Sequence, residues 1–351
     1  MSNRESVVNT APWSGAVNRR WLLAEFPQGE FRAENFRWSE SEVLAPADGQ
    51  LVVRNSYLSL DPTNRIWASG AQSYLPAMKR GEVMRGLTLG EVVASRDARI
   101  EIGARVTGLL GWQDYAVVRA SAVQVLQCDP RRPVTDYLGV MGSTGLTAYF
   151  GLLDVGIPRS GETVLVSAAA GAVGSLVGQI ARLQGCRAVG LVGSASKAQW
   201  ITEELGFDGA INYREENVAE AIARECPSGV DIYFDNVGGD ILDAAMGQLN
   251  LRGRIVLCGL ISQYNSSSPL QELRNLGRFL VQRGRMQAFI VIDYLSRANE
   301  AYAQIADWLE RGQLQYRMDI VQGLEHAPAA LAKLFDGSNV GKLLVQINGP
   351  K

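Results

Sequence analysis

The pattern of hydrophobic residues changes along the chain. Over residues 21–126, short runs of strand-forming residues are bounded by turn residues, which is typical of a β-rich domain. From about residue 137 onward, short apolar runs alternate with helical stretches, the arrangement that builds a parallel sheet with crossover helices. The sequence therefore predicts a β-rich part followed by an α/β part.

Individual elements follow from these two patterns. In the β-rich part we expect strands at residues 50–54, 90–95, 105–110 and 114–118. In the α/β part we expect strands at residues 163–167, 188–192, 210–213, 230–234, 254–258 and 288–292, and a helix at 298–311. Two further strands, 316–321 and 342–347, flank a helix at 328–335 and indicate that the chain returns to its first part.

The length of the chain supports this division. Its 351 residues exceed the roughly 250 to 300 residues at which a single core stops growing, so two domains are expected. The predicted fold class is α/β. A domain with a parallel sheet and crossover helices is expected over residues 141–314, and a β-rich domain is expected from residues 1–140 and 315–351.

Charge and targeting signals narrow the class of protein. The formal net charge is −2 and no dense Lys/Arg block is present, which disfavours a nucleic-acid partner. Residues 1–20 lack the apolar core of a secretory signal, so a cytoplasmic location is the default expectation. Residues 163–181 carry no charged side chain, but they divide into a β-branched run, a turn of small residues and a helical pattern, and we interpret them as strand, turn and helix, not as a membrane span.

The turn after the strand at 163–167 is rich in small residues, Ala169-Ala170-Gly171-Ala172-Val173-Gly174. Gly171 lets backbone N–H groups approach a pyrophosphate, and Gly174 allows close packing of the helix, whose N-terminus carries partial positive charge. Ala169 replaces the first glycine of the usual fingerprint. Because the turn lies within a βαβ alternation, we predict a dinucleotide site; the alternative is a merely structural turn.

The end of the second strand of this unit indicates which dinucleotide is bound. An Asp or Glu there would bind the 2′-hydroxyl of NAD. This strand ends in Leu191-Val192-Gly193-Ser194 without a carboxylate, and Lys197 follows. We therefore predict NADPH, with Ser194 and Lys197 at its 2′-phosphate; the alternative for Lys197 is a solvated lysine at a helix start.

Several motifs along the chain together resemble those of one family. They are Tyr57-Leu58-Ser59-Leu60-Asp61-Pro62, Gly81-Glu82-Val83-Met84-Arg85-Gly86, Leu146-Thr147-Ala148-Tyr149-Phe150-Gly151, the glycine turn, Tyr233-Phe234-Asp235-Asn236-Val237-Gly238-Gly239, Cys258-Gly259-Leu260-Ile261-Ser262-Gln263-Tyr264-Asn265 and Asn339-Val340-Gly341-Lys342. The chain resembles the zinc-independent medium-chain dehydrogenases/reductases, which include prostaglandin, curcumin and plant double-bond reductases. It departs from them at Thr63-Asn64-Arg65, where the family often has Tyr-Met-Arg, and at Thr144, where the family has proline. Both departures flank the expected substrate cleft, so they affect the prediction of the preferred substrate and not that of the fold.

The resemblance implies a GroES-like substrate domain built from both chain ends around a Rossmann domain with a doubly wound parallel sheet. It also implies an active site in the cleft between the domains, and a homodimer. It also completes the predicted cofactor site. That site comprises Gly171, Ala172, Val173, Gly174, Ser194, Lys197, Tyr213, Asn236, Cys258, Gly259, Ile261, Ser262, Tyr264, Phe289, Ile290, Val291 and Asn339.

The available side chains do not predict a metal site. A zinc alcohol dehydrogenase needs a set of Cys and His ligands. The four cysteines are scattered and are interpreted as buried thiols, and the one histidine, His326, stands where a helix is expected to start. These cysteines are Cys128, Cys186, Cys226 and Cys258.

Without a Lewis acid, hydride transfer is easiest to the β-carbon of an α,β-unsaturated ketone or aldehyde, whose oxygen then needs a hydrogen-bond donor. Tyr264 is the predicted donor, because its loop follows the carboxyl end of a sheet strand; the alternative is a tyrosine packed on the cofactor. Tyr57 is predicted to contact substrate, with core packing as the alternative. The competing functions are an NADPH quinone oxidoreductase and a non-catalytic NADPH-binding regulatory protein, which an assay with enals, enones and quinones distinguishes.

Overall fold

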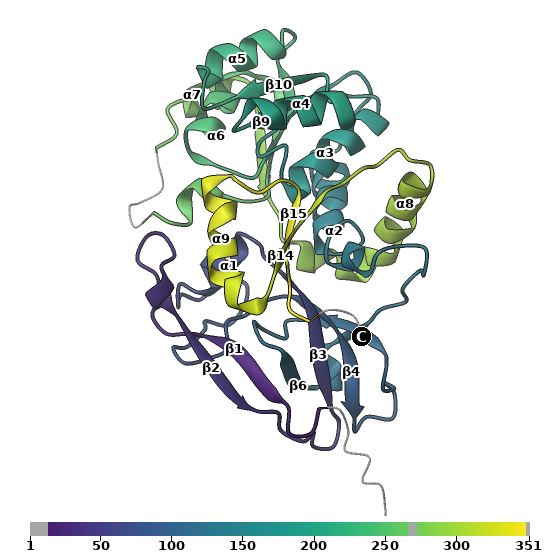
Figure 1. The fold of residues 1–351 in the computed structure, drawn as a ribbon. Coiled ribbons are helices and arrows are strands. Elements are labelled where there is room, and N and C mark those ends of the chain that lie inside the picture. The colour runs from purple at the N-terminus through teal and green to yellow at the C-terminus, as the bar shows by residue number, and fades with distance from the viewer. Residues whose placement is uncertain (1–12, 267–271, 349–351) are drawn as a thin grey trace, which may run out of the picture.

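The protein is described by a computed structural model that covers residues 13–266 and 272–348. Two sheets and one hairpin account for its strands (Figure 1). The hairpin pairs β1 (Val17–Leu23) with β2 (Phe36–Glu42).

A six-stranded parallel sheet occupies the middle of the chain, with the spatial order β10-β9-β8-β11-β12-β13. From β8 the chain first adds strands on one side and then, from β11, on the other side. Ligands of such doubly wound sheets bind where this direction reverses, here between β8 and β11. The strands are β8 (Thr163–Val166), β9 (Arg187–Val192), β10 (Gly209–Asn212), β11 (Val230–Asp235), β12 (Leu249–Leu257) and β13 (Arg285–Ala288).

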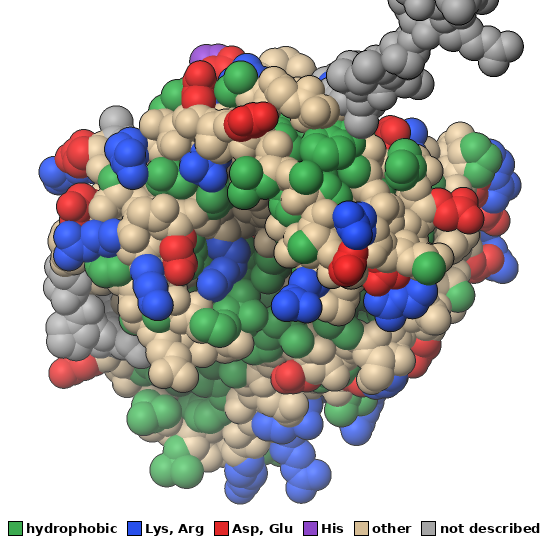
Figure 2. Space-filling model, turned by 90° about the horizontal axis from the view of Figure 1, so that it is seen from below, with side chains coloured by type: hydrophobic (Ala, Val, Ile, Leu, Met, Phe, Trp, Pro, Cys, Tyr) green, Lys and Arg blue, Asp and Glu red, His purple; other side chains and the backbone are tan. Residues whose placement is uncertain are grey.

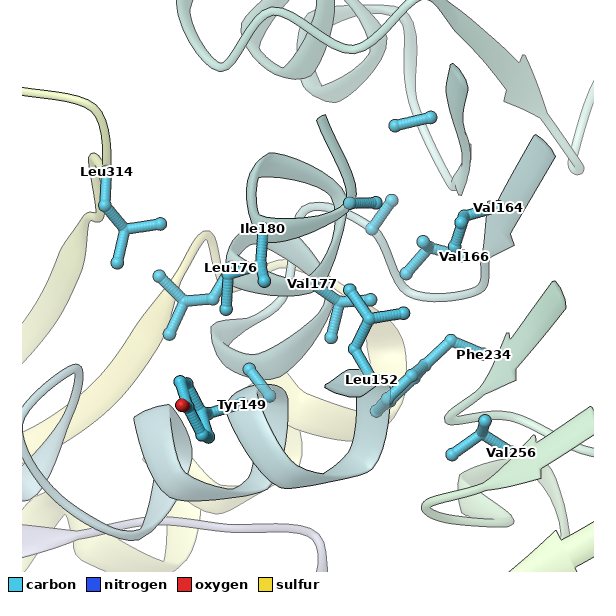
Figure 3. Close-up of a cluster of buried hydrophobic side chains, with 14 of the residues drawn as sticks. Tyr149, Leu152, Val164, Val166, Leu176, Val177, Ile180, Phe234, Val256 and Leu314 are labelled. Atoms are coloured by element: carbon cyan, nitrogen blue, oxygen red, sulfur yellow. The ribbon is translucent and has the colours of Figure 1, made fainter. Parts of the chain in front are cut away.

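Alternate residues of the central strands face opposite helix layers, as the two-residue period of a strand requires. Val164 and Val166 of β8 lie in one hydrophobic cluster, whereas Leu165 lies in another. Figure 3 shows the first cluster, in which side chains of α3 point toward those of β8 and β11. The first face is covered by α2 (Ser143–Phe150), α3 (Ala172–Leu183) and α8 (Ala298–Glu310), and the second by α5 (Val218–Glu225) and α6 (Gly239–Gly247). The shorter helices of this part are α4 (Ala195–Gln199) and α7 (Leu276–Val281).

Strands from both ends of the chain form a seven-stranded sheet. β15 pairs antiparallel with β3 and parallel with β14, so the last strands complete a sheet that the first strands begin. The strands are β3 (Gln50–Ser59), β4 (Thr88–Ser95), β5 (Arg105–Gly108), β6 (Tyr115–Arg119), β7 (Gln124–Val125), β14 (Met318–Gln322) and β15 (Lys342–Gln346). Two helices accompany this sheet, α1 (Thr63–Trp67) and α9 (Ala327–Asp336).

The predicted fold class is confirmed, because a doubly wound parallel sheet is joined to a separate, mostly antiparallel β domain. The exact domain boundaries stay a prediction. The uncharged run is strand β8, a turn and helix α3, as predicted. In the described part of the chain, no helix is both long and apolar enough to span a membrane. Figure 2 shows Lys/Arg and Asp/Glu side chains mixed over one face of the molecule. This face has a hollow in which the visible side chains are largely hydrophobic.

The predicted strand at 288–292 is wrong. The sixth strand of the sheet, β13, ends at Ala288, and a 3₁₀ helix covers Val291–Arg297. β13 lies at the sheet edge, where polar residues are tolerated, and the apolar residues after it lie beyond the end of the strand. Ile290 and Ile292 are accordingly 37% and 44% exposed.

The prediction of four buried thiols is wrong for Cys128, which is only partly buried. Cys186 and Cys226 are buried, and the residue Cys258 is partly exposed although its thiol is buried. Cys258 directly follows the last residue of β12, and Cys128 lies three residues after the end of β7. Both therefore stand past the ends of their strands and not within a sheet.

Gly145 in α2 approaches the backbone that precedes the helix, and a Cβ built on it would lie 1.8 Å from the carbonyl oxygen of Val140. We expect Gly145→Ala to lower the free energy of unfolding by about 1 to 3 kcal/mol, because the backbone must shift. Gly277→Ala is the control, since a Cβ there would meet nothing within 4 Å. Urea denaturation compares the variants, and equal midpoints would contradict this packing of α2.

Candidate active site and cofactor cleft

Most of the predicted cofactor residues lie along one edge of the parallel sheet. Because the six strands run in the same direction, their carboxyl ends meet at that edge. The loops after β8 to β13 carry, in this order, Gly171, Ser194, Tyr213, Asn236, Cys258 and Phe289. The structure therefore gathers residues that are scattered over more than a hundred positions of the sequence.

The glycine turn is held tightly against the start of α3. Gly171 caps the helix, and its N–H donates to the carbonyl oxygen of Ala168 at 2.8 Å. A Cβ on Gly174 would lie 2.4 Å from that same oxygen, so this position requires glycine. The first N–H groups of α3 have no acceptor within the helix and face the space beyond the turn, where they can bind an anion.

Ala169, which replaces the first glycine of the usual fingerprint, is accommodated by a glycine on the neighbouring strand. A Cβ on Gly190 of β9 would lie 2.6 Å from the methyl carbon of Ala169. The N–H of Ala169 donates to the carbonyl oxygen of Leu191 at 3.0 Å. The departure from the fingerprint therefore leaves the turn intact.

Two basic side chains lie close together at the ends of β9 and β10. Lys197 donates from Nζ to the carbonyl oxygen of Gly337 at 2.6 Å, and Arg214 donates from Nη2 to the carbonyl oxygen of Asp336 at 2.6 Å. Burial and the nearby Arg214 cation lower the pKa of Lys197. An anion between these two cations would relieve their repulsion.

The surroundings of these cations have room for a phosphate. Ser194 caps α4 and accepts at Oγ from the N–H of Lys197 at 3.3 Å. Gly193 lies beside Tyr213, since a Cβ on it would be 2.8 Å from the Tyr213 hydroxyl oxygen. Arg214 was not predicted from the sequence. It follows β10 as Ser194 follows β9, and because parallel strands end at one edge, this spacing would have placed the two residues close together.

A buried carboxylate joins the loops after β8 and β11. Asp235 accepts at Oδ1 from the hydroxyl of Tyr233 at 2.7 Å, from the hydroxyl of Ser167 at 3.1 Å, and from two backbone N–H groups at 2.9 Å. Burial raises the pKa of Asp235, and these hydrogen bonds oppose the shift. The side chain of Asn236 donates to the carbonyl oxygen of Ser167 at 2.7 Å, so Asn236 is fixed at the centre of the edge.

The loop after β12 folds onto the loop after β11. The N–H groups of Cys258 and Gly259 donate to the carbonyl oxygen of Asp235, at 2.9 and 3.1 Å, and those of Ile261 and Ser262 donate to carbonyl oxygens of the β11 loop. Burial raises the pKa of the Cys258 thiol to about 12. The predicted cofactor residues of this loop thus form one rigid turn.

Tyr264 ends this turn, and its hydroxyl oxygen accepts a hydrogen bond from the N–H of Leu260 at 3.0 Å. Burial raises the pKa of Tyr264, so the phenol is protonated at neutral pH. A hydroxyl that accepts from an N–H keeps its own proton for another acceptor. The geometry therefore provides a hydrogen-bond donor beside the cofactor loops.

Tyr74 of the β domain lies near enough to Tyr264 to contribute to its raised pKa. The Tyr74 hydroxyl accepts from Trp67 Nε1 at 3.2 Å and contacts the hydroxyl of Thr63. Tyr74 also lines a hollow of about 450 Å³ formed by residues 72–77. Tyr74 was not predicted from the sequence, because its loop has no periodic pattern of hydrophobic residues. Thr63, in contrast, was noted as a departure from the family.

Tyr57 packs in a hydrophobic cluster with Leu89, Leu138 and Leu344. This packing matches the core alternative, and its contact with substrate stays a prediction. Thr144, the other departure, is buried in the first turn of α2.

Of the remaining predicted residues, Phe289 and Val291 follow the edge strand β13, and Asn339 lies between α9 and β15. Phe289 is buried and packs on Phe234, with ring centroids 6.5 Å apart, and Val291 packs against the same cluster. Asn339 donates to the carbonyl oxygen of Gly341 at 3.3 Å.

Two motifs from opposite ends of the chain form an ion pair beside the glycine turn. Lys342 is 4% exposed, and its Nζ donates to Asp61 Oδ1 at 2.6 Å and to the carbonyl oxygen of Leu60 at 3.0 Å. The N–H of the preceding Gly341 donates to the carbonyl oxygen of Ala170 at 2.9 Å. The last strand therefore connects the β domain to the turn.

Known proteins share both parts of this architecture. Residues 19–126 match the family profile described as the N-terminal domain of oxidoreductase, and residues 172–311 match the profile described as zinc-binding dehydrogenase. The chain is 42% identical over 337 residues to the NADPH-dependent curcumin reductase of Escherichia coli, covering 95% of this chain and 97% of that protein. The chain belongs to the zinc-independent medium-chain dehydrogenase/reductase family.

Two further members of the family support this assignment. The 2-alkenal reductase (NADP(+)-dependent) of Nicotiana tabacum is 39% identical over 300 residues, which cover 85% of this chain and 87% of that protein. CurA from Vibrio vulnificus, solved in complex with NADPH, is 44% identical with a TM-score of 0.89, covering 95% of this chain and 100% of that chain. Although one profile is named for zinc, no three His, Cys, Asp or Glu residues within residues 13–266 and 272–348 are grouped to hold a metal ion.

Proposed function

We propose that this protein uses NADPH to reduce the carbon–carbon double bond of α,β-unsaturated ketones or aldehydes. Two relatives with 42% and 39% identity are an NADPH-dependent curcumin reductase and an NADP(+)-dependent 2-alkenal reductase, which supports this reaction class. The observation that carries the proposal is the Tyr264 hydroxyl, which accepts from Leu260 N–H and keeps its proton for a substrate oxygen.

The carboxyl edge of the parallel sheet fits NADPH. The N-terminus of α3 behind Gly171 would hold the pyrophosphate, and Ser194, Lys197 and Arg214 would hold the 2′-phosphate. When bound, NADPH would supply the hydride that adds to the β-carbon of the substrate, and a proton taken up from water at the α-carbon would complete the reduction.

Tyr264 then acts on the carbonyl end of the substrate. As the β-carbon is reduced, negative charge develops on the carbonyl oxygen, and the Tyr264 hydroxyl donates a hydrogen bond to it. The hydrogen bond from Leu260 fixes the direction of the hydroxyl before substrate binds. Such preorganised donors need no rearrangement as the charge forms.

Tyr264→Phe is expected to lower kcat for an enone on the order of a hundredfold, because it removes an oxyanion donor, while the KM for NADPH stays nearly constant. Steady-state kinetics measures both. Since the pKa of Tyr264 is raised above its ordinary value of 10.0, wild-type kcat should not fall through this group below pH 10. Tyr302→Phe, on the partly buried side of α8, is the control. An unchanged kcat in Tyr264→Phe would remove Tyr264 from the mechanism.

Lys197→Ala and Arg214→Gln should each raise the KM for NADPH on the order of tenfold, because each removes a charge-assisted hydrogen bond to the 2′-phosphate. The KM for NADH, which lacks this phosphate, should stay the same. Arg224→Gln on α5 is a control, since its guanidinium pairs with Glu216. Equal increases for both cofactors would contradict the assignment.

We further propose that two copies associate through the outer edge of the parallel sheet. Among the described residues β13 pairs with β12 alone, so its other side can pair with a second β13 in a two-fold arrangement. Beside it, Leu276, Leu280 and Val281 of α7 are 55%, 77% and 67% exposed, which makes an apolar patch suited to burial. The cytoplasmic location stays a prediction from the sequence.

Leu280→Glu should convert the dimer to a monomer, because it places a charge at the centre of this apolar patch. Light scattering coupled to size-exclusion chromatography measures the mass of both proteins. A wild-type protein that is monomeric at micromolar concentration would contradict the proposed interface.

A further inference from the structure

Arg65 carries a buried positive charge whose hydrogen-bond partners in the described part of the chain are all neutral. It is 6% exposed, and burial lowers its pKa. Its Nε donates to the carbonyl oxygen of Gly29 and to Asn265 Oδ1, both at 3.1 Å, and its Nη2 donates to the carbonyl oxygens of Pro27 and Gly29, at 3.1 and 2.9 Å. The guanidinium also lies 5.7 Å from the ring centroid of Phe31.

One of these contacts, the hydrogen bond to Asn265, crosses from one domain to the other. Arg65 belongs to α1 of the β domain, whereas Asn265 directly follows Tyr264 in the loop after β12. The backbone hydrogen bonds of Ile261 and Ser262 in that loop stay within the parallel-sheet domain. The bond between Arg65 and Asn265 therefore connects the β domain to the residue next to Tyr264.

Tyr264 is thus held at its hydroxyl group and at its backbone. Its hydroxyl accepts from Leu260, and its backbone is followed at once by the anchored Asn265. A guanidinium suits this task because its planar donors can hold two chain segments at once, whereas an ammonium is a single point of charge. Because the guanidinium donor is ionised, its hydrogen bond to Asn265 is charge-assisted.

We propose that Arg65, acting through Asn265, is a positioning residue that fixes the Tyr264 hydroxyl relative to the substrate oxygen. This inference rests on the proposed function, because it assigns Tyr264 the role of donor. A purely structural Arg65 would instead serve only to tie the segment at Pro27 and Gly29 to α1. In that case, changes at Asn265 would leave catalysis unaltered.

Asn265 variants test the proposal without removing a buried charge. Asn265→Ala should lower kcat for an enone on the order of tenfold with the KM for NADPH within about twofold, because small misplacements of a catalytic group are costly. Asn265→Asp keeps an acceptor oxygen for Arg65 and should retain kcat within about threefold. Asn250→Ala, at the amino end of β12, is the matched control and should leave kcat unchanged.

A double-mutant cycle separates positioning from general damage. In the Tyr264→Phe background, Asn265→Ala should lower kcat by less than about twofold further, because there is no hydroxyl left to misplace. Arg65→Lys should show the same dependence on Tyr264. Hydrogen exchange at the Leu260 amide, measured without cofactor, should accelerate in Asn265→Ala and not in Asn265→Asp.

Two outcomes would overturn the proposal in distinguishable ways. If Tyr264→Phe lowers kcat but Asn265→Ala does not, or if the loss in Asn265→Ala is undiminished in the Tyr264→Phe background, Arg65 does not position Tyr264 and the proposed function stands. If Tyr264→Phe itself has wild-type kcat, the assigned role of Tyr264 fails and this inference fails with it.

Discussion

The carboxyl ends of the six parallel strands lie at one edge of their sheet, and this constraint places the loops that form the candidate site. The chain adds strands on one side of β8 and later on the other side, so the loops after β8 and β11 are neighbours at the reversal point. Asp235 then joins these loops through the hydroxyl of Ser167 and two backbone N–H groups. Without that alignment, the glycine turn and the Tyr264 loop would not share a site.

The β domain completes the site from the opposite side. Its last strand reaches the glycine turn through Gly341, and Lys342 pairs with Asp61 directly beyond it. The last residue of α9, Asp336, and the following Gly337 accept hydrogen bonds from Arg214 and Lys197. These contacts connect the C-terminal part of the β domain with the parallel-sheet domain, so the return of the chain to its first sheet brings that domain to the glycine turn.

Local patterns were sufficient to predict most of the fold, and the structure brings most of the predicted cofactor residues to one edge of the parallel sheet. The strand, glycine turn and helix at 163–181 could be recognised because each has its own composition, and the absence of a carboxylate after Val192 pointed to the 2′-phosphate. The strand at 288–292 could not be placed, because an edge strand with the polar sequence of β13 lacks the apolar signal on which the prediction relied. Tyr74, Arg65 and the pairing of Lys342 with Asp61 depend on contacts between residues far apart in sequence, and a single sequence carries no signal for them.

The position of the transferred hydrogen in the product shows whether the carbon–carbon double bond or the carbonyl group has been reduced. NADPH carrying deuterium at the reactive position of the nicotinamide is incubated with the protein and an enone, and the product is analysed by NMR. Reduction of the carbon–carbon double bond predicts a saturated ketone with deuterium on the former β-carbon. Deuterium on the former carbonyl carbon, in an allylic alcohol, would contradict it.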